Sequence, residues 1–426
     1  MPPGARGRGV SLPLSLSVYR LATAALEPLA PLLLKRRAAR GKEDPARLNE
    51  RLARPAIPRP DGPLVWLHGA SVGESLSILP LVERLRAERP GATLLVTSGT
   101  VTSAELLAKR LPQGAIHQFA PVDTPGGARR FIDHWRPDLA VFVESELWPN
   151  LLLEAKAVGT RLALVSAKLS DKSFDGWRMR PFAAHRLFSG FDLILAQDAR
   201  AAERFTSLGG AVAGEADLKF GAAPLPADPA ELARLKVAFA GRSLLLAAST
   251  HTGEDEIVLD AFTSLPNRPR LVIVPRHVER GPAIVEMAGG RGLSVSLRSI
   301  DPTAMSDVIV ADTLGELGLW FRLADLALVA GSLVPGIGGH NPLEPARLSC
   351  PIVSGPHVEN WLTAYAELSA VDGMALADAS VLGLRLAAAL ADPAAGQARA
   401  ERAAAFVEAR DVEARAGLSR IIELVP

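Results

Sequence analysis

Residues 65–74 read VWLHGASVGE, an apolar run followed by a turn of small residues and a Gly-Glu pair. The run LVWLH (64–68) predicts a buried strand, and an amphipathic helix is predicted to begin near Glu74. Ser71 and Glu74 have the spacing of a capping box, in which the two side chains satisfy free N–H groups of a new helix. A glutamate in the loop after a strand also suits catalysis, so both interpretations of Glu74 stand at this point.

The strand-then-helix pattern around this stretch recurs along the chain and predicts an α/β fold. Further apolar runs occur at 93–98, 139–144, 161–166 and 191–197, and after the Pro/Ala-rich connector GAAPLPADPAE (221–231) at 243–249, 270–275, 307–312, 325–331 and 350–355. Such alternation is typical of parallel sheets. We therefore expect two Rossmann-like, doubly wound domains facing a cleft, with ligands beyond the carboxyl ends of the strands.

The predicted boundaries are an N-terminal segment (1–45), a first domain (46–224) and a second domain (225–426). The alanine-rich end of the chain either caps the second domain or crosses back to the first. A chain of 426 residues is long enough for two hydrophobic cores. Its 47 basic and 46 acidic residues nearly cancel, so no global field favours a nucleic-acid partner. Cys350 is the only cysteine, which excludes an intramolecular disulfide and fits a reducing compartment.

The N-terminal segment combines an apolar run with a basic flank. Val10 to Leu34 is apolar but interrupted by prolines and charges, so it makes a poor membrane-spanning helix. Five basic residues follow it directly: Lys35, Arg36, Arg37, Arg40 and Lys42. This order differs from that of a secretory signal and favours an anchor on anionic lipid at the cytoplasmic side of a membrane. The alternative is a helix packed on the protein's own surface.

Polar motifs follow several of the predicted strands in both domains. They are VFVESELWPN (141–150), ASTHTGE (248–254), VPRH (274–277), VADTLGEL (310–317) and GSLVPGIGGHNPLEPA (331–346). In the last, Gly338 and Gly339 allow close backbone approach, and Asn341 is a plausible cap of a helix whose N-terminus and first-turn Glu344 suit a phosphate and ribose hydroxyls. Arg276 adds a charge for the phosphate or base. Thr313 and Glu316 form a second capping-box pattern.

Several familiar cofactor motifs are absent from the sequence. There is no Walker A motif and no G-x-G-x-x-G after the first strand, which argues against a P-loop ATPase and a standard NAD dehydrogenase. No Asp-x-Asp triplet offers a metal-diphosphate clamp. We therefore predict no cofactor and no metal.

In order and spacing, HGASVGE, ESELWPN, LKF (218–220), STHTGE, PRH, DTLGEL and GGHNPLEPA resemble the 3-deoxy-D-manno-octulosonic acid (Kdo) transferases of lipopolysaccharide synthesis. The resemblance runs from about residue 15 to 420. It implies a GT-B glycosyltransferase at the cytoplasmic side of the cell inner membrane that moves Kdo from CMP-Kdo to the lipid A precursor, lipid IVA, with inversion. Its partners are then that donor, that acceptor and anionic inner-membrane lipid, with no nucleic acid.

The same resemblance assigns roles to individual residues. Glu74 becomes the general base, and Glu144 and Lys219 support the transition state. The residues implied for CMP are Pro275, Arg276, Leu314, Gly315, Glu316, Asn341, Pro342, Leu343 and Glu344. The sequence departs from the family pattern where Lys168 and Lys172 replace arginines, which removes their fork geometry.

Two other functions remain open from the sequence. One is a GT-B transferase that uses a different nucleotide sugar with a lipid acceptor. The other is a non-catalytic sugar-nucleotide-binding membrane protein, which has no need of a base. The joint presence of Glu74, Glu144 and Lys219 favours an enzyme.

Overall fold

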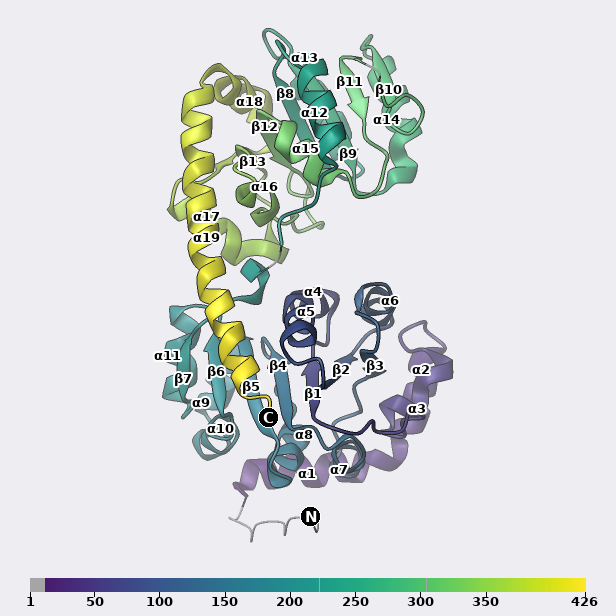
Figure 1. Ribbon diagram of the computed structural model, residues 1–426, viewed down its shortest axis with the longest axis vertical. Coiled ribbons are helices and arrows are strands. Elements are labelled where there is room, and N and C mark those ends of the chain that lie inside the picture. Colours follow the sequence, from purple (N-terminus) through teal and green to yellow (C-terminus); the bar gives the residue numbers. More distant parts are fainter. Residues whose placement is uncertain (1–11, 222, 304) are drawn as a thin grey trace. The chain divides into compact units, whose positions relative to one another are not determined.

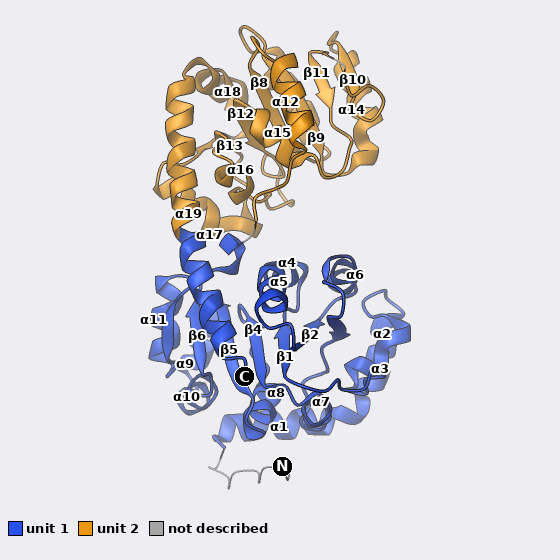
Figure 2. Ribbon diagram, viewed as in Figure 1, with its two compact units in different colours: residues 1–222, 410–426 blue, residues 223–409 orange. Residues whose placement is uncertain are grey.

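The computed structural model describes residues 12–221, 223–303 and 305–426, which fold into two compact units (Figures 1 and 2). The first unit comprises the chain up to residue 222 together with 410–426, and the second comprises 223–409. The division between them falls in the Pro/Ala-rich connector. Val10 and Ser11 of the apolar N-terminal run lie outside the described residues.

The first unit contains a seven-stranded parallel sheet in the order β3-β2-β1-β4-β5-β6-β7. Its strands are β1 (Leu64–His68), β2 (Thr93–Ser98), β3 (Ile116–Phe119), β4 (Leu139–Val143), β5 (Arg161–Ala167), β6 (Leu193–Ala196) and β7 (Val212–Glu215). Strand β1 is buried along its whole length, as expected for a parallel strand covered on both faces. Trp66 packs in the core on one face, and Val65 and Leu67 pack in the core on the other.

Helices cover both faces of this sheet (Figure 1). They are α1 (Leu14–Leu26), α2 (Ala30–Ala38), α3 (Leu48–Arg51), α4 (Val72–Ser77), α5 (Leu79–Glu88), α6 (Val101–Arg110), α7 (Pro125–Trp135), α8 (Pro149–Ala157), α9 (Asp171–Arg178), α10 (Pro181–Phe188) and α11 (Ala199–Ser207), with 3-10 turns at Glu27–Leu29, Pro45–Arg47 and Leu218–Gly221. Many begin at a residue whose side chain accepts a backbone N–H, such as Thr124 before α7 and Asp198 before α11.

The second unit repeats the architecture with a sheet in the order β10-β11-β9-β8-β12-β13-β14, also parallel. Its strands are β8 (Leu244–Thr250), β9 (Arg270–Pro275), β10 (Val295–Leu297), β11 (Val308–Val310), β12 (Leu326–Val329), β13 (Ile352–Ser354) and β14 (Ala375–Leu376). Its helices are α12 (Pro229–Ala238), α13 (Glu254–Thr263), α14 (Gly281–Gly289), α15 (Leu317–Leu323), α16 (Leu343–Arg347), α17 (Leu362–Ala370) and α18 (Leu382–Ala391), with 3-10 turns at Val278–Arg280, Glu359–Trp361 and Ala379–Val381.

The last helix, α19 (Pro393–Glu423), begins in the second unit and ends in the first. Its final turns bury Leu418, Ile421 and Ile422 in the same core as Val65 and Leu67 of β1. Of the two alternatives for the chain's end, the structure therefore has the one in which it returns to the first unit.

In the first sheet, β2 and β3 lie on one side of β1, and β4 and all later strands lie on the other side, so the strand order reverses between β1 and β4. In the second sheet the same reversal falls between β8 and β12. Loops that follow strands on either side of such a switch point diverge and leave room for ligands. Glu74 follows β1 and Glu144 follows β4, while the STHTGE motif and the glycine-rich loop follow β8 and β12. These four motifs therefore lie at the switch points, where doubly wound folds bind ligands, whereas VPRH and VADTLGEL lie at the ends of β9 and β11 on one side of the second switch point.

Helix α1 packs on the first unit through its polar side chains. The Tyr19 hydroxyl donates to Asp123 (2.8 Å), and Arg20 pairs with Glu154 of α8 (2.8 Å). Leu16 is buried beneath the helix. In the part of the chain that the structure describes, no helix has the length and apolar character needed to span a bilayer.

Candidate active site

Glu74 lies in the first turn of α4, directly after the loop that follows β1. Its backbone N–H donates to the Ser71 hydroxyl (3.3 Å), and that hydroxyl donates to Glu74 Oε1 (2.8 Å). Glu74 Oε2 accepts the N–H of Ala70 (2.8 Å), one residue before the cap. The structure therefore shows a variant of the capping box, with the carboxylate held at the start of the helix.

The pKa of Glu74 is raised, first because the carboxyl is partly buried and second because Glu146 lies near it. Hydrogen bonds from Ser71 and Ala70 oppose the shift, and the charge of Glu144 adds to it. A carboxylate with a raised pKa is a better proton acceptor than an ordinary one. Glu74 thus has the electrostatic surroundings of a general base as well as the hydrogen bonds of a cap.

Glu144 is 9% exposed and adopts a φ of +57°, a left-handed conformation uncommon outside glycine. Its carboxylate pairs with Lys219 (3.2 Å) through one oxygen and with Lys168 through the other. Its backbone N–H donates to Val165 O (2.9 Å), which ties the strained residue to the end of β5. Backbone strain of this kind persists only where the surroundings enforce it, and it is concentrated at functional sites.

Glu146 forms the third part of this cluster. Its Oε2 accepts the indole N–H of Trp148 (2.7 Å) and lies 3.3 Å from Nε2 of the buried His68. The other ring nitrogen of His68 contacts the Thr97 hydroxyl (2.8 Å). Burial acts to raise the pKa of Glu146, but the contacts with His68 and Trp148 outweigh it and lower the pKa. Glu146 is therefore the ionised neighbour that helps to keep the pKa of Glu74 high.

The structure brings together the three residues expected to act in catalysis, Glu74, Glu144 and Lys219. Sequence reasoning placed Glu146 at the same strand end but gave it no role, and it did not select His68 or Asp217. Asp217 is buried beside Lys219, whose N–H it accepts (3.0 Å), and it also binds Gln197 (3.0 Å). Both residues lie next to motifs already selected from the sequence: His68 is two residues before ASVGE, and Asp217 comes directly before LKF.

In the second unit, the residues expected to bind CMP fall into two groups. The first lies around the end of β12, where Asn341 Oδ1 accepts the Leu343 N–H (3.0 Å) and its amide donates to Glu344 Oε1 (3.3 Å). Burial raises the pKa of Glu344, while Asn341 and the charge of the exposed Arg276 act to lower it. Pro275, Pro342 and Leu343 are buried and support this group.

Two details of this loop differ from the expectation. Helix α16 has only five residues and begins at Leu343, so it offers a much weaker dipole than a full helix. Gly338 and Gly339 have φ of +92° and +78°, and a Cβ at Gly338 would lie 2.5 Å from the Asn360 side chain. The loop's own conformation and packing therefore already favour glycine at both positions, and a role in ligand approach stays a prediction.

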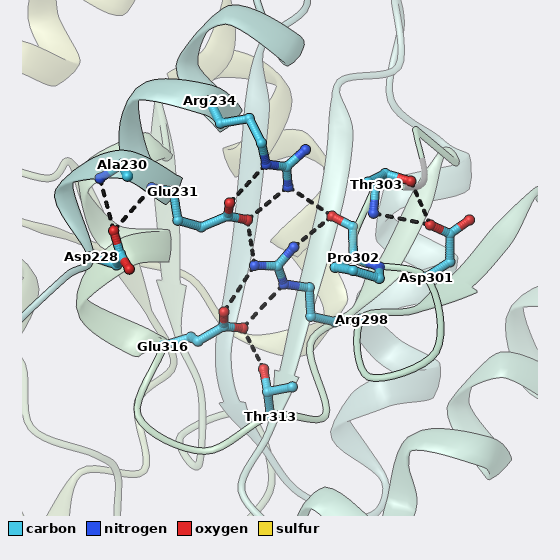
Figure 3. A network of polar contacts seen from close by, with 10 residues as sticks. All are labelled: Asp228, Ala230, Glu231, Arg234, Arg298, Asp301, Pro302, Thr303, Thr313 and Glu316. Carbon is cyan, nitrogen blue, oxygen red and sulfur yellow. Dashed lines mark hydrogen bonds and ion pairs between the residues drawn. The ribbon is translucent and has the colours of Figure 1, made fainter.

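The second group surrounds Glu316 and is drawn in Figure 3. Arg298 donates to Glu316 Oε1 (2.9 Å) and also to Glu231 (2.6 Å), which in turn pairs with Arg234 (2.7 Å). These contacts lower the pKa of Glu231 to about 2. Glu316 therefore belongs to a network of two arginines and two glutamates.

The Thr313–Glu316 pair is not a capping box. Helix α15 begins at Leu317, so Glu316 precedes it as the cap residue, and the Thr313 hydroxyl bonds to the Glu316 side chain. Gly315 has φ of +86° and Leu314 is 85% exposed. The Leu314–Glu316 segment is thus an exposed turn whose acidic residue is held by Arg298.

Two histidines, one in the loop after β8 and one in the loop after β12, contact each other. Nε2 of His251, from STHTGE, is 2.9 Å from Nε2 of His340, and the rings stack with centroids 5.1 Å apart. Burial, with the nearby charges of His251 and Arg276, lowers the pKa of His340 to about 4. A neutral pair of imidazoles therefore joins the two loops at neutral pH. Among the described residues there is no cluster of three or more His, Cys, Asp or Glu side chains able to hold a metal ion.

Comparison with known proteins identifies the family. The sequence model of the 3-deoxy-D-manno-octulosonic-acid transferase (kdotransferase) family matches residues 46–222. The chain is 34% identical to the 3-deoxy-D-manno-octulosonic acid transferase of Bordetella pertussis over 421 residues, 92% of this chain and 95% of that protein. It is 35% identical to a probable mitochondrial enzyme of the same name from Arabidopsis thaliana, over 81% of this chain and 80% of the relative.

The fold has a counterpart among solved structures. A glycosyltransferase from Rickettsia africae superposes with a TM-score of 0.55 over 86% of this chain and 99% of its own, at 11% identity. At that identity the likeness concerns the fold alone, and it supports the GT-B arrangement of two parallel α/β units. The sequence relatives show that the chain belongs to the Kdo transferase family and is a glycosyltransferase.

Proposed function

We propose that the protein transfers Kdo from CMP-Kdo to a lipid A precursor, lipid IVA, in lipopolysaccharide biosynthesis, with inversion at the anomeric carbon. The observation that carries the proposal is the partly buried Glu74 carboxylate, with its raised pKa, beside Glu144, Glu146 and Lys219 at the switch point of the first sheet. A sugar hydroxyl is a weak nucleophile, and a base that takes its proton typically contributes about 10²–10⁴-fold.

In this mechanism Glu74 accepts the proton of the acceptor hydroxyl while that oxygen attacks the anomeric carbon of Kdo. The bond to CMP breaks on the opposite face of the sugar, so one displacement inverts the centre. Negative charge grows on the departing phosphate, and cationic side chains held in advance stabilise it. Lys219 is held in that way by Glu144 (3.2 Å).

For the donor we propose the second unit, with Arg276, Asn341 and Glu344 as the polar contacts and Pro275, Pro342 and Leu343 behind them. Arg276 is exposed and lies within electrostatic reach of Glu344, so it is free to meet the phosphate. Leu314, Gly315 and Glu316 form a second contact, in which Arg298 fixes the orientation of the Glu316 carboxylate (2.9 Å). We propose that no metal and no cofactor takes part.

We propose that the protein meets its lipid acceptor at the cytoplasmic side of the inner membrane, to which α1 and α2 bind. The polar side of α1 faces the protein, while Leu14 and Leu21 are 81% and 74% exposed. Met179 and Phe182, near the start of the adjacent α10, are 81% and 80% exposed. A helix that presents its apolar side outward, followed by basic residues, suits the interface of an anionic bilayer.

The proposed function is tested by measuring the transfer of Kdo to the lipid acceptor. The full-length protein is incubated with CMP-Kdo and tetraacylated lipid A precursor in mixed micelles, with and without EDTA, and the products are weighed by mass spectrometry. We expect the acceptor's mass to increase by whole Kdo residues in both samples. Transfer from a different nucleotide sugar in place of CMP-Kdo, or complete loss of product in EDTA, would contradict the assignment.

A further inference from the structure

Glu254 is the last residue of the STHTGE motif and lies in the first turn of α13, where its carboxylate is completely buried. Neither the sequence nor the proposed function assigns it a role. Its Oε2 accepts the N–H groups of His251 (3.0 Å) and Gly331 (2.8 Å), and its Oε1 accepts those of Ser332 and Leu333 (2.9 Å each). Burying an unpaired charge is costly, and four charge-assisted hydrogen bonds offset that cost here. The carboxylate therefore joins the loop after β8 to the loop after β12.

The segment that Glu254 holds is the beginning of the glycine-rich loop, 331–341. Gly331 O accepts the Gly339 N–H (2.8 Å), which closes the loop on itself. At the far end His340 stacks on His251, and its backbone carbonyl accepts the Tyr365 hydroxyl (3.1 Å). Glu254 fixes the start of the loop, and it also holds the backbone of His251, the residue on which the end of the loop rests.

The buried side chain of Ser332, within the same segment, forms further hydrogen bonds that hold it. The Ser332 hydroxyl donates to Val329 O (2.8 Å) and accepts the Gly355 N–H (2.8 Å). A Cβ at Gly355 would lie 2.0 Å from Ser332 O, so β13 and the loop are in close contact. The loop is thus held at its start from two directions, and the negative charge of Glu254 acts on three successive N–H groups at once.

We infer that Glu254 is a positioning residue for donor binding: it holds loop 331–341 in the one conformation in which Asn341 and Glu344 meet the nucleotide. The inference rests on the proposed function, because it takes these two residues as nucleotide contacts. Glu254 itself has all four of its hydrogen bonds within the protein and does not touch the ligand. Its effect reaches the nucleotide only through the shape of the loop.

The variant Glu254→Gln tests this in the full-length protein. Glutamine has one accepting oxygen and an amide that donates, so two of the four N–H groups lose their acceptor. If the loop adopts its binding conformation for only a fraction of the time, the affinity for the nucleotide is multiplied by that fraction. We expect the Kd for CMP, measured by calorimetry, and the KM for CMP-Kdo each to rise about tenfold or more. We expect kcat to change by less than about threefold, because bound donor restores the loop.

Two further variants separate positioning from ordinary stability. Asp325 accepts the Leu244 N–H (2.8 Å) at the opposite end of β12, so Asp325→Ala removes a bond of the same kind, from a backbone N–H to a carboxylate, in the same sheet. It should lower the melting temperature and leave the Kd for CMP unchanged. Glu254→Asp keeps the charge on a shorter side chain and should recover part of the affinity, and it replaces Glu254→Gln if that variant does not fold.

The possible outcomes distinguish this inference from the proposed function. If the wild-type protein does not bind CMP, the proposed function fails and this inference falls with it. If the wild-type protein binds CMP and a folded Glu254 variant binds it equally well, the proposed function stands and the positioning role is overturned. Equal loss of affinity in Asp325→Ala would overturn it as well.

Discussion

At the scale of single residues, Glu74 combines the hydrogen bonds of a helix cap with electrostatic surroundings that suit a base. A cap needs a carboxylate whose oxygens point back to the helix start, and Glu74 bonds there to Ser71 and Ala70. A base needs a carboxylate with a high proton affinity, and burial together with Glu146 and Glu144 provides it. The cap fixes the position of the group while its acidic neighbours tune its pKa.

This pairing predicts how stability changes with pH. The pKa of Glu74 in the folded protein lies above its ordinary value, so the folded state holds the proton at pH values where the unfolded state has lost it. The stabilisation from Glu74 is therefore present below the ordinary pKa and is lost as the pH rises through the folded-state pKa. Glu74→Gln carries no charge there, so its free energy of unfolding at pH 7 should equal or exceed that of the wild type. Urea titrations at pH 4.5 and pH 7 measure this, and a variant less stable at pH 7 only would contradict it.

The two lysines on Glu144 allow a matched comparison. Each of Lys219→Met and Lys168→Met leaves Glu144 with one cation, because the two lysines bind different oxygens. If Lys219 itself stabilises the transition state, its loss should lower kcat by about 10²-fold, as for other preorganised charges, whereas Lys168→Met should cost much less. Steady-state kinetics decide between the two. Equal losses would mean that Lys219 acts only through Glu144.

These residue contacts mark the limit of prediction from the sequence. Glu74 and Glu144 lie in motifs near predicted strand ends, and the resemblance of the sequence to the Kdo transferases singled out both of them and Lys219. Some contacts join segments far apart in the chain: the ion pair between Lys168 and Glu144, the contact of His68 with Glu146, and three of the four N–H bonds of Glu254. Such pairings depend on side-chain direction after folding, which periodicity does not encode.

At the scale of elements, strands were easier to predict than helix termini. Strands buried on both faces are continuous apolar runs, which are distinct in the sequence. Helix termini depend on a few hydrogen bonds, and here the Thr313 pattern failed and α16 proved short. Helix α1 packs on the protein, as one alternative for the N-terminal segment expected, and it also exposes apolar side chains, while the membrane anchor stays a prediction.

The packing of α1 changes how its membrane role is tested. Deleting the segment would leave the buried Asp123 without the Tyr19 hydroxyl and Glu154 without Arg20, so a truncated protein is expected to lose stability. The double substitution Leu14→Glu and Leu21→Glu alters only exposed positions. It should weaken binding to anionic vesicles by about tenfold or more, since each buried leucine contributes about 1.5–3 kcal/mol.

The control for this substitution is Val237→Glu, an exposed apolar residue on α12 of the second unit (80% exposed). Combined with Ile300→Glu in the same unit (77% exposed), it adds the same two charges elsewhere, and this control should leave vesicle binding unchanged in flotation assays at low salt. Unaltered flotation of the α1 variant, with its melting temperature also unaltered, would show that α1 does not bind the membrane.

At the scale of the whole molecule, the chain consists of two units of the same architecture, and the proposed function assigns the base to the first and the donor to the second. Each sheet reverses its strand order once, and Glu74, Glu144 and the Asn341–Glu344 group follow strands at that reversal, whereas Lys219 and the Leu314–Glu316 turn follow β7 and β11. The doubly wound topology could be predicted because strand and helix patterns alternate along the whole sequence. The return of α19 to the first unit could not, because an alanine-rich helix fits either core equally well.

The most direct measurement of the central claim, that Glu74 is the base of this transferase, is the single-turnover rate of full-length Glu74→Gln with CMP-Kdo and the lipid A precursor. Glutamine keeps a hydrogen-bonding side chain at the cap but cannot take up the proton. The account predicts normal folding, an unchanged Kd for CMP in the second unit, and a rate lower by about two orders of magnitude or more. A rate within a few-fold of the wild type would contradict it and leave Glu74 as a helix cap only.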